Sequence, residues 1–239
     1  MAERRFFFVH LQKTGGTALF QRLRESFGAA AVYPRPEDTS GPTAVLDVGH
    51  LTEELRAHGD DIEVVTGHFP LCLVDVLDGP FSTFTVLRDP VERTLSLLRR
   101  RQMADDRFQG QGLADIYADP ALQAIIRNHM VKMLSLTPDE MTATPLMAPV
   151  VFDADRLERA KHNLAERIDV FGLQTDFEVF CAELEARFGW ELGPPRFANR
   201  TPPQPVADEL RDRIAVDNQM DVDLYEFARQ LHAERHDGF

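Results

Sequence analysis

The sequence predicts an α/β fold in which a central, mostly parallel sheet is flanked by helices. Short apolar runs rich in β-branched and aromatic residues recur at 5–9, 62–66, 82–87 and 169–173, and these runs are expected to form strands. Segments with apolar residues at helical spacing alternate with the runs. Alternation of strands and helices is typical of chains that build a parallel sheet.

Size, charge and cysteine content narrow the class of protein. A length of 239 residues with 44% hydrophobic content suits one domain over residues 1–239. The formal net charge of −13 argues against a general nucleic-acid binder, although it allows a local basic pocket for a small polyanion. Cys72 and Cys181 are too few for a disulfide framework, and the apolar run 6–9 is too short for a signal-peptide core or a membrane span. The expected location is the cytoplasm.

The first predicted strand, 5–9, leads into a glycine-rich turn, and a helix is expected over 18–27, ending at Gly28. Gly15 and Gly16 let the backbone curl around a ligand without obstruction by side chains. The free amides at the start of the helix then point toward the occupant of the loop. These residues predict an anion-binding loop for a phosphate or a sulfate.

Side chains of the loop add further donors. Lys13 supplies a mobile positive charge, while Thr14 and Thr17 supply hydroxyl groups that can also cap the helix. The order of residues differs from the nucleotide triphosphate loop, in which the lysine follows the glycines. An alternative interpretation is a strand-to-helix turn in which the glycines are incidental.

The segments on either side of the next strand are less informative. Strands are expected at 44–48 and 62–66, with a helix over 52–58 between them. The turn-rich segment 33–43 is interpreted as a surface loop near the mouth of the site. The segment 102–120 carries no motif, so it is interpreted as a flexible substrate-side loop or a boundary between helices.

A histidine follows the predicted strand 62–66. His68 comes just after the strand and a glycine, at the edge where open α/β sheets bind ligands. Beside an anion loop it becomes the leading candidate for a general base, although a structural or surface role is the simpler alternative. His10 and His50 compete for the same role, because each could also approach the site.

The clearest interior strand is followed by a second group of polar residues. Asp89 and Pro90 predict the capped start of a helix. Arg88 would lie at the strand end and Ser96 about two turns into the helix, where the two could hold one further phosphate. In the alternative interpretation, Arg88 forms a surface ion pair with Asp89 or Glu92.

Apolar stripes at helical spacing predict helices over 122–134, 154–167, 177–188 and 206–231, which would cover the sheet. The arginine triplet 99–101 is interpreted as a solvated cluster that complements a helix dipole, in preference to a substrate patch. The eight histidines show no metal-ligand spacing, so the predicted chemistry uses no metal ion.

Taken in order, these motifs resemble those of the sulfotransferases that use 3′-phosphoadenosine 5′-phosphosulfate (PAPS). The nearest resemblance is to the branch with the heparan sulfate 2-O- and 6-O-sulfotransferases and their soluble bacterial relatives, in which a K-T-G-G-T loop follows the first strand. The resemblance covers most of the chain and rests on residues 7–17, 66–68, 86–96, 128–134, 169–173 and 199–202. It implies a P-loop-like, three-layer fold.

The resemblance also implies roles for individual residues. The residues that would bind the 5′-phosphosulfate are Lys13, Thr14, Gly15, Gly16 and Thr17. Lys13 would also stabilise the charge that develops on the bridging oxygen, and His68 would take the proton of the acceptor hydroxyl. Arg88 and Ser96 would bind the 3′-phosphate. The residues that look like part of a C-terminal loop closing over the nucleotide are Asn199, Arg200 and Thr201.

Three positions depart from the family pattern. Leu11 and Gln12 replace the isoleucine and proline that usually precede the lysine, and Ala18 stands where a serine is common. The missing serine removes one hydroxyl donor from the loop.

The predicted function is therefore transfer of a sulfuryl group from PAPS to a hydroxyl of a carbohydrate, a glycoconjugate or a small metabolite. A nucleotide-dependent kinase should instead show a lysine after the glycines and an acidic metal ligand at another strand end. A non-catalytic anion-binding module would not need Lys13, His68 and Arg88 at three successive strand ends.

Overall fold

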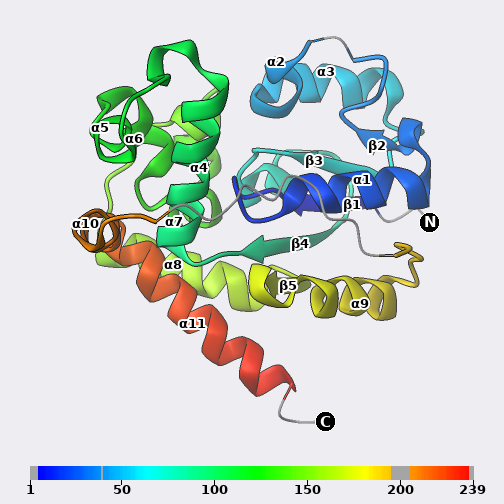
Figure 1. Cartoon of the computed structure of the whole chain (residues 1–239). Coiled ribbons are helices and arrows are strands. Elements are labelled where there is room, and N and C mark those ends of the chain that lie inside the picture. The colour runs from blue at the N-terminus through cyan, green and yellow to red at the C-terminus, as the bar shows by residue number, and fades with distance from the viewer. Residues whose placement is uncertain (1–4, 39, 195–204, 237–239) are drawn as a thin grey trace.

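The central sheet of the protein is entirely parallel. The computed structural model describes residues 5–38, 40–194 and 205–236, and within them five strands form one sheet in the order β2-β3-β1-β4-β5 (Figure 1). The strands are β1 (Arg5–Val9), β2 (Val32–Tyr33), β3 (Val64–Gly67), β4 (Phe81–Leu87) and β5 (Val170–Leu173). The predicted α/β class is confirmed.

Helices connect and cover these strands. In the described part of the chain they are α1 (Gly16–Phe27), α2 (Pro42–Leu46), α3 (Val48–His58), α4 (Pro90–Ala104), α5 (Leu113–Tyr117), α6 (Pro120–Ile126), α7 (His129–Ser135), α8 (Ala154–Glu166), α9 (Phe177–Phe188), α10 (Asp208–Asp217) and α11 (Gln219–His236). The predicted helix starts after the glycine loop and at Pro90 are both observed, and Asp89 caps α4 by accepting the amide of Glu92 at 2.9 Å.

Helices pack on both faces of the sheet because successive strand residues point to opposite sides. Phe8 of β1 is buried in one apolar cluster with Leu19 of α1 and Phe180 of α9. Its neighbour Phe7 is buried in the other cluster, together with Leu164 of α8 and residues of α4, α7 and α11. This arrangement makes the three layers that the resemblance implied.

The segment 44–48, which was expected to be a strand, forms most of a short helix instead. Pro42 occupies the first turn of α2, and the carboxylate of Asp47 then accepts the amide of His50 at 2.8 Å to start α3. A short segment with four apolar residues out of five is compatible with either a strand or a buried helix, so its composition did not decide between them. The edge of the sheet is formed by β2, which pairs with β3.

Two helices that were expected to be continuous are each interrupted at an asparagine. Asn128 adopts φ 41° between α6 and α7, and Asn218 lies between α10 and α11. The amide of Asn128 donates to Oδ1 of Asn218 at 2.9 Å, and Oδ1 of Asn128 accepts the amide of Asp221 at 3.2 Å. The two breaks therefore face each other and exchange the hydrogen bonds that a continuous helix would have made internally.

The segment 102–120 contains more regular structure than expected. The helix α4 continues to Ala104, and α5 occupies Leu113–Tyr117. Figure 1 shows α5 and α6 grouped beside α4. Along the described ranges, no helix is both long and apolar enough to cross a membrane.

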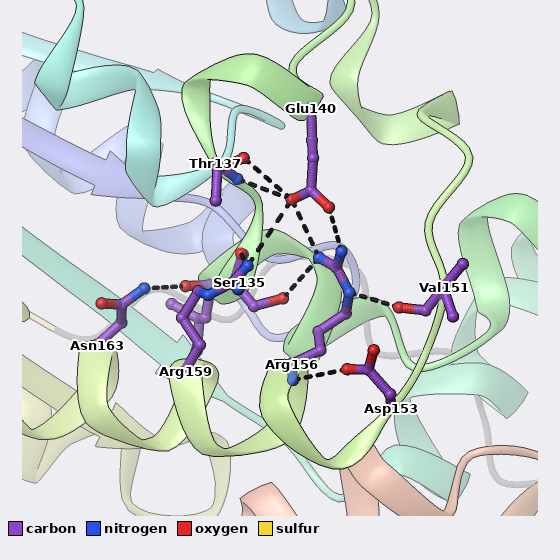
Figure 2. A network of polar contacts seen from close by, with 9 residues as sticks. Ser135, Thr137, Glu140, Val151, Asp153, Arg156, Arg159 and Asn163 are labelled. Carbon is purple, nitrogen blue, oxygen red and sulfur yellow. Dashed lines mark hydrogen bonds and ion pairs between the residues drawn. The ribbon is translucent and has the colours of Figure 1, made fainter.

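A polar network fastens the connection between α7 and α8 (Figure 2). The guanidinium group of Arg156 pairs with the carboxylate of Glu140 and donates from Nε to the carbonyl of Val151 at 2.6 Å. Nδ2 of Asn163 donates to the carbonyl of Leu134 at 2.7 Å, and Arg159 donates to the carbonyl of Ser135 at 3.2 Å. These bonds fix the end of α7 against α8.

Candidate functional site

The carboxyl ends of three strands meet beside one cavity. Val9 of β1 pairs in register with Gly67 of β3 and with Thr85 of β4. The chain therefore leaves β1 and β3 at adjacent positions, and it leaves β4 two residues beyond this level. A cavity of about 1100 Å³ opens there. The predicted site residues that line it are Lys13, Gly15, Gly16, Thr17, His68, Arg88 and Ser96.

The glycine loop starts α1 with free backbone donors. Gly15 is the N-cap residue at φ 103°, and no side chain caps the helix, so the expectation that Thr14 or Thr17 does so is wrong. Thr14 is buried, and its hydroxyl donates to the carbonyl of Leu11 at 2.9 Å. The first amides of a helix have no intrahelical acceptor, which leaves them available for an anion.

Both loop glycines are required by their surroundings. A Cβ atom on Gly16 would lie 2.1 Å from the ring of His10, and one on Gly15 would lie 3.3 Å from the ring of Phe177. The positive φ of Gly15 also favours glycine. The interpretation in which the glycines are incidental is therefore not supported.

Arg88 supports the loop and forms none of the alternative ion pairs. Its Nη1 donates to the carbonyl of Lys13 at 3.0 Å. Glu92 pairs with Arg211 at 2.6 Å, and Asp89 is engaged as the cap of α4. The Arg88 guanidinium group therefore faces the cavity beside the loop.

Three consecutive arginines of α4 also line the cavity, so their interpretation as a solvated cluster outside the site is corrected. Arg99, Arg100 and Arg101 lie within the helix, which runs on to Ala104, and they continue the surface on which Ser96 lies. Burial and the charges of Arg100, Arg88 and Arg101, in that order, lower the pKa of Lys13. Among the described residues, five lysine and arginine side chains line the cavity against two acidic ones, Asp105 and Asp106, so the lining carries an excess of positive charge although the chain carries a net charge of −13.

His68 has the hydrogen-bonding pattern of a base. Its Nδ1 lies 2.9 Å from the carbonyl oxygen of His10, and a carbonyl can only accept, so Nδ1 carries the proton. The Nε2 lone pair is then free to accept a proton. Burial, with a smaller contribution from the charge of Lys13, lowers the pKa of His68, while its bond to His10 opposes the shift. At neutral pH the imidazole is therefore neutral.

The two competing histidines have different surroundings. The ring of His10 stacks on Phe8 with centroids 5.0 Å apart and lies 4.6 Å from the ring of His68, and burial holds its pKa well below 6.5. Nε2 of His50 lies 2.9 Å from Oδ2 of Asp38, and this contact raises the pKa of His50. His50 is not among the residues that line the cavity, whereas His10 is.

Several residues at the site were not identified as site residues from the sequence. Three apolar residues of α2 line the cavity: Pro42, Val45 and Leu46. Two glutamines from other segments, Gln12 and Gln174, line it as well. Pro42 belongs to the segment 33–43, which was expected near the mouth of the site. Nε2 of His129 lies beneath the loop and accepts the amide of Gln12 at 3.1 Å. These two residues are 117 positions apart, so no local pattern could have paired them.

The proposed nucleotide-closing residues Asn199, Arg200 and Thr201 lie outside the described residues. Within the described part of the chain, no three His, Cys, Asp or Glu side chains gather in a group that could hold a metal ion.

No family model and no curated protein sequence matches the chain. Its fold is similar to that of a sulfotransferase from Alicyclobacillus acidocaldarius, known from a crystal structure, with a TM-score of 0.52. The match covers 95% of this chain and 95% of that chain at 15% sequence identity. The likeness shows a shared fold, and with it the P-loop-like arrangement that the sequence motifs implied.

Proposed function

We propose that this protein is a sulfotransferase that transfers the sulfuryl group of PAPS to a hydroxyl group of an acceptor. The proposal is carried by one observation: an anion-binding loop with Lys13, the pair Arg88 and Ser96, and a neutral His68 all face one cavity. The fold shared with a bacterial sulfotransferase supports it.

Two groups of residues in the cavity are proposed to receive the charged groups of the donor. The amides at the start of α1, with Lys13 and Thr17, would receive the 5′-phosphosulfate. Arg88 and Ser96, which extend from the end of β4 and from α4, would receive the 3′-phosphate. A ligand with two separate anionic groups would engage both sets of residues, whereas a ligand with a single phosphate chain would engage the loop.

Lys13 and His68 divide the chemistry between the two ends of the transfer. His68 Nε2 would accept the proton of the attacking hydroxyl as the new oxygen–sulfur bond forms. Lys13 and the loop amides would stabilise the negative charge that develops on the phosphate oxygen as the old bond breaks. An in-line transfer of this kind depends mainly on positioning and on such charge stabilisation.

The acceptor is proposed to be a carbohydrate, a glycoconjugate or a small metabolite. Incubation of the protein with sulfur-labelled PAPS and fractionated cell extracts would identify the molecule that gains the label.

A kinase is disfavoured because Asp89, the acidic residue at the end of β4, is engaged as a helix cap, and because Lys13 precedes the glycines.

The donor assignment is tested by calorimetry with 3′-phosphoadenosine 5′-phosphate (PAP), 5′-AMP and ATP. We expect PAP to bind most tightly because it alone fills both anion sites. Loss of the charged hydrogen bonds of Arg88 to the 3′-phosphate should cost about 1.5–3 kcal/mol, so Arg88→Ala should weaken PAP binding by roughly 10- to 150-fold. Because Arg88 also donates to the carbonyl of Lys13, 5′-AMP should be weakened less, by the part of the effect that acts through the loop. Equal affinities of the wild-type protein for PAP and 5′-AMP would refute the 3′-phosphate site.

A further inference from the structure

A buried histidine contacts the backbone of the donor loop from below. His129 is the first residue of α7 and is fully buried. Its Nε2 lies 3.1 Å from the amide nitrogen of Gln12. Because an amide can only donate, Nε2 carries the lone pair and the neutral ring keeps its proton on Nδ1. Burial, followed by the charge of Arg93, lowers the pKa of His129 well below 6.5 and thereby maintains this neutral form.

The contacted amide immediately precedes the one lysine of the loop. Lys13 has φ 69°, a left-handed conformation that is unfavourable for a residue with a Cβ atom. It persists only where the surroundings hold it. Two bonds do so here: the amide of Gln12 is held by His129, and the carbonyl of Lys13 is held by Arg88 at 3.0 Å. The backbone that orients the Lys13 side chain is thus clamped at both ends.

His129 is itself held by buried groups from other elements. The carboxylate of Asp221, from α11, accepts the amides of Met130 at 3.2 Å and Val131 at 2.8 Å in the first turn of α7. Asn128, which precedes His129, donates its amide to Asn218. The start of α7 is therefore a rigid support, and His129 connects it to the loop.

We propose that His129 is a positioning residue, which acts through the amide of Gln12 to hold Lys13 in the conformation that directs its ammonium group toward the donor. The bond between His129 and Gln12 and the conformation of Lys13 stand without any assumption about the donor. The consequence for catalysis rests on the proposed function. A purely structural role would require His129 only to fill space in the core.

The test uses three substitutions. His129→Leu keeps an apolar side chain but removes the acceptor, and His129→Gln places an amide oxygen near the former Nε2. Lys132→Met is the matched control on the same helix, because buried Lys132 donates to the carbonyls of Ala124 and Leu146 and has no bond to the loop. It measures the effect of damaging α7 alone.

Two readouts report on the loop without any ligand. Hydrogen exchange of the Gln12 amide reports on the bond itself. Nuclear magnetic resonance of labelled lysine reports the pKa of Lys13, and the chain has only three lysines, Lys13, Lys132 and Lys161. We expect His129→Leu to speed exchange of the Gln12 amide by at least about tenfold. The pKa of Lys13 should also rise toward its ordinary value, as the side chain moves away from the arginines and into water.

His129→Gln should restore slow exchange of the Gln12 amide and the lowered pKa of Lys13, and Lys132→Met should leave both unchanged. Unaltered readouts in His129→Leu, or the same changes in Lys132→Met, would overturn the proposal. If His129→Leu fails to fold, His129→Asn replaces it, because the shorter amide cannot reach Gln12.

Once the acceptor is known, turnover should fall in the leucine variant while the affinity for PAP is largely kept. Failure of wild-type protein to bind PAP would refute the proposed function and leave the two loop readouts valid.

Discussion

A substitution of Lys13 can distinguish two proposed roles of its ammonium group: binding of the donor, and stabilisation of the charge that develops on the donor during transfer. Its ammonium group is partly desolvated and surrounded by arginines, so it gains most from a ligand whose negative charge increases during the reaction. We predict that Lys13→Ala lowers turnover more than it lowers donor affinity. The measurement is steady-state kinetics combined with calorimetry of PAP.

The control for Lys13 is Lys161→Ala on α8. Lys161 pairs with Glu158 at 2.9 Å and is not among the residues that line the cavity, so this substitution should leave turnover unchanged. A rise in the Michaelis constant for the donor at unchanged turnover would make Lys13 a binding residue only.

His68 lines the cavity, its Nε2 is free to accept a proton, and burial lowers its pKa. We predict that His68→Ala retains PAP affinity but slows transfer by roughly 100- to 10,000-fold across the pH range. The neutral imidazole is the active form, so wild-type activity should fall only as the pH drops through the lowered pKa, on the acidic side of 6.5. This limb should be absent from the residual activity of the variant.

His10 provides the comparison for His68. Its ring covers Gly16 and lies against His68, so His10→Ala tests whether the neighbouring imidazole is the base instead. Near-normal turnover of the His68 variant, with loss of turnover in the His10 variant, would move the assignment to His10.

At the scale of elements, the helix α4 is long enough to carry three arginines, Arg99, Arg100 and Arg101, along the cavity. Arg100 is the charged group that most strongly lowers the pKa of Lys13. We predict that Arg100→Gln raises the pKa of Lys13, because a neighbouring cation that disfavours the ammonium form is removed. A titration of labelled lysine by nuclear magnetic resonance measures this shift. Arg99→Gln is the control, since Arg99 acts on the pKa of Arg88 instead, and equal shifts in both variants would contradict the prediction.

The elements that could be predicted from sequence are those with strong local signals. The strand, glycine loop and helix at the start of the chain, and the Asp89–Pro90 start of α4, each depend on residues a few positions apart. The segment 44–48 was wrongly predicted because a short, mainly apolar segment does not distinguish strand from helix. The arginine triplet 99–101 was misplaced because its position depends on where α4 ends and on what lies opposite, which are tertiary properties.

At the scale of the whole molecule, the sequence predicted which residues follow successive strands but not what lies beneath them. His68 and Arg88 could be placed at one edge because parallel strands end together. His129 could not, because its contact with Gln12 depends on the break of a predicted helix at Asn128 and on bonds from α11. Such long-range buried contacts leave no periodic pattern in the chain.

Donor binding should stabilise the whole molecule, because the cavity joins residues that follow β1, β3 and β4 and extends along α4. A ligand that binds only the folded state at about 100 times its dissociation constant adds about 2.7 kcal/mol to the free energy of unfolding. For a chain of this size that corresponds to a rise in melting temperature of roughly 5–10 °C. We therefore predict a shift of this size with PAP, measured by thermal unfolding at matched multiples of the dissociation constant.

At equal ligand concentrations the same measurement separates the two anion sites. The shift should be much smaller with 5′-AMP, which lacks the 3′-phosphate. Arg88→Ala should reduce the PAP shift at least to the 5′-AMP value, because the variant loses the charged hydrogen bonds to the 3′-phosphate and also the bond that holds the carbonyl of Lys13. A PAP shift that survives Arg88→Ala undiminished would place the 3′-phosphate elsewhere along α4, where Arg99, Arg100 and Arg101 are the next cations that line the cavity.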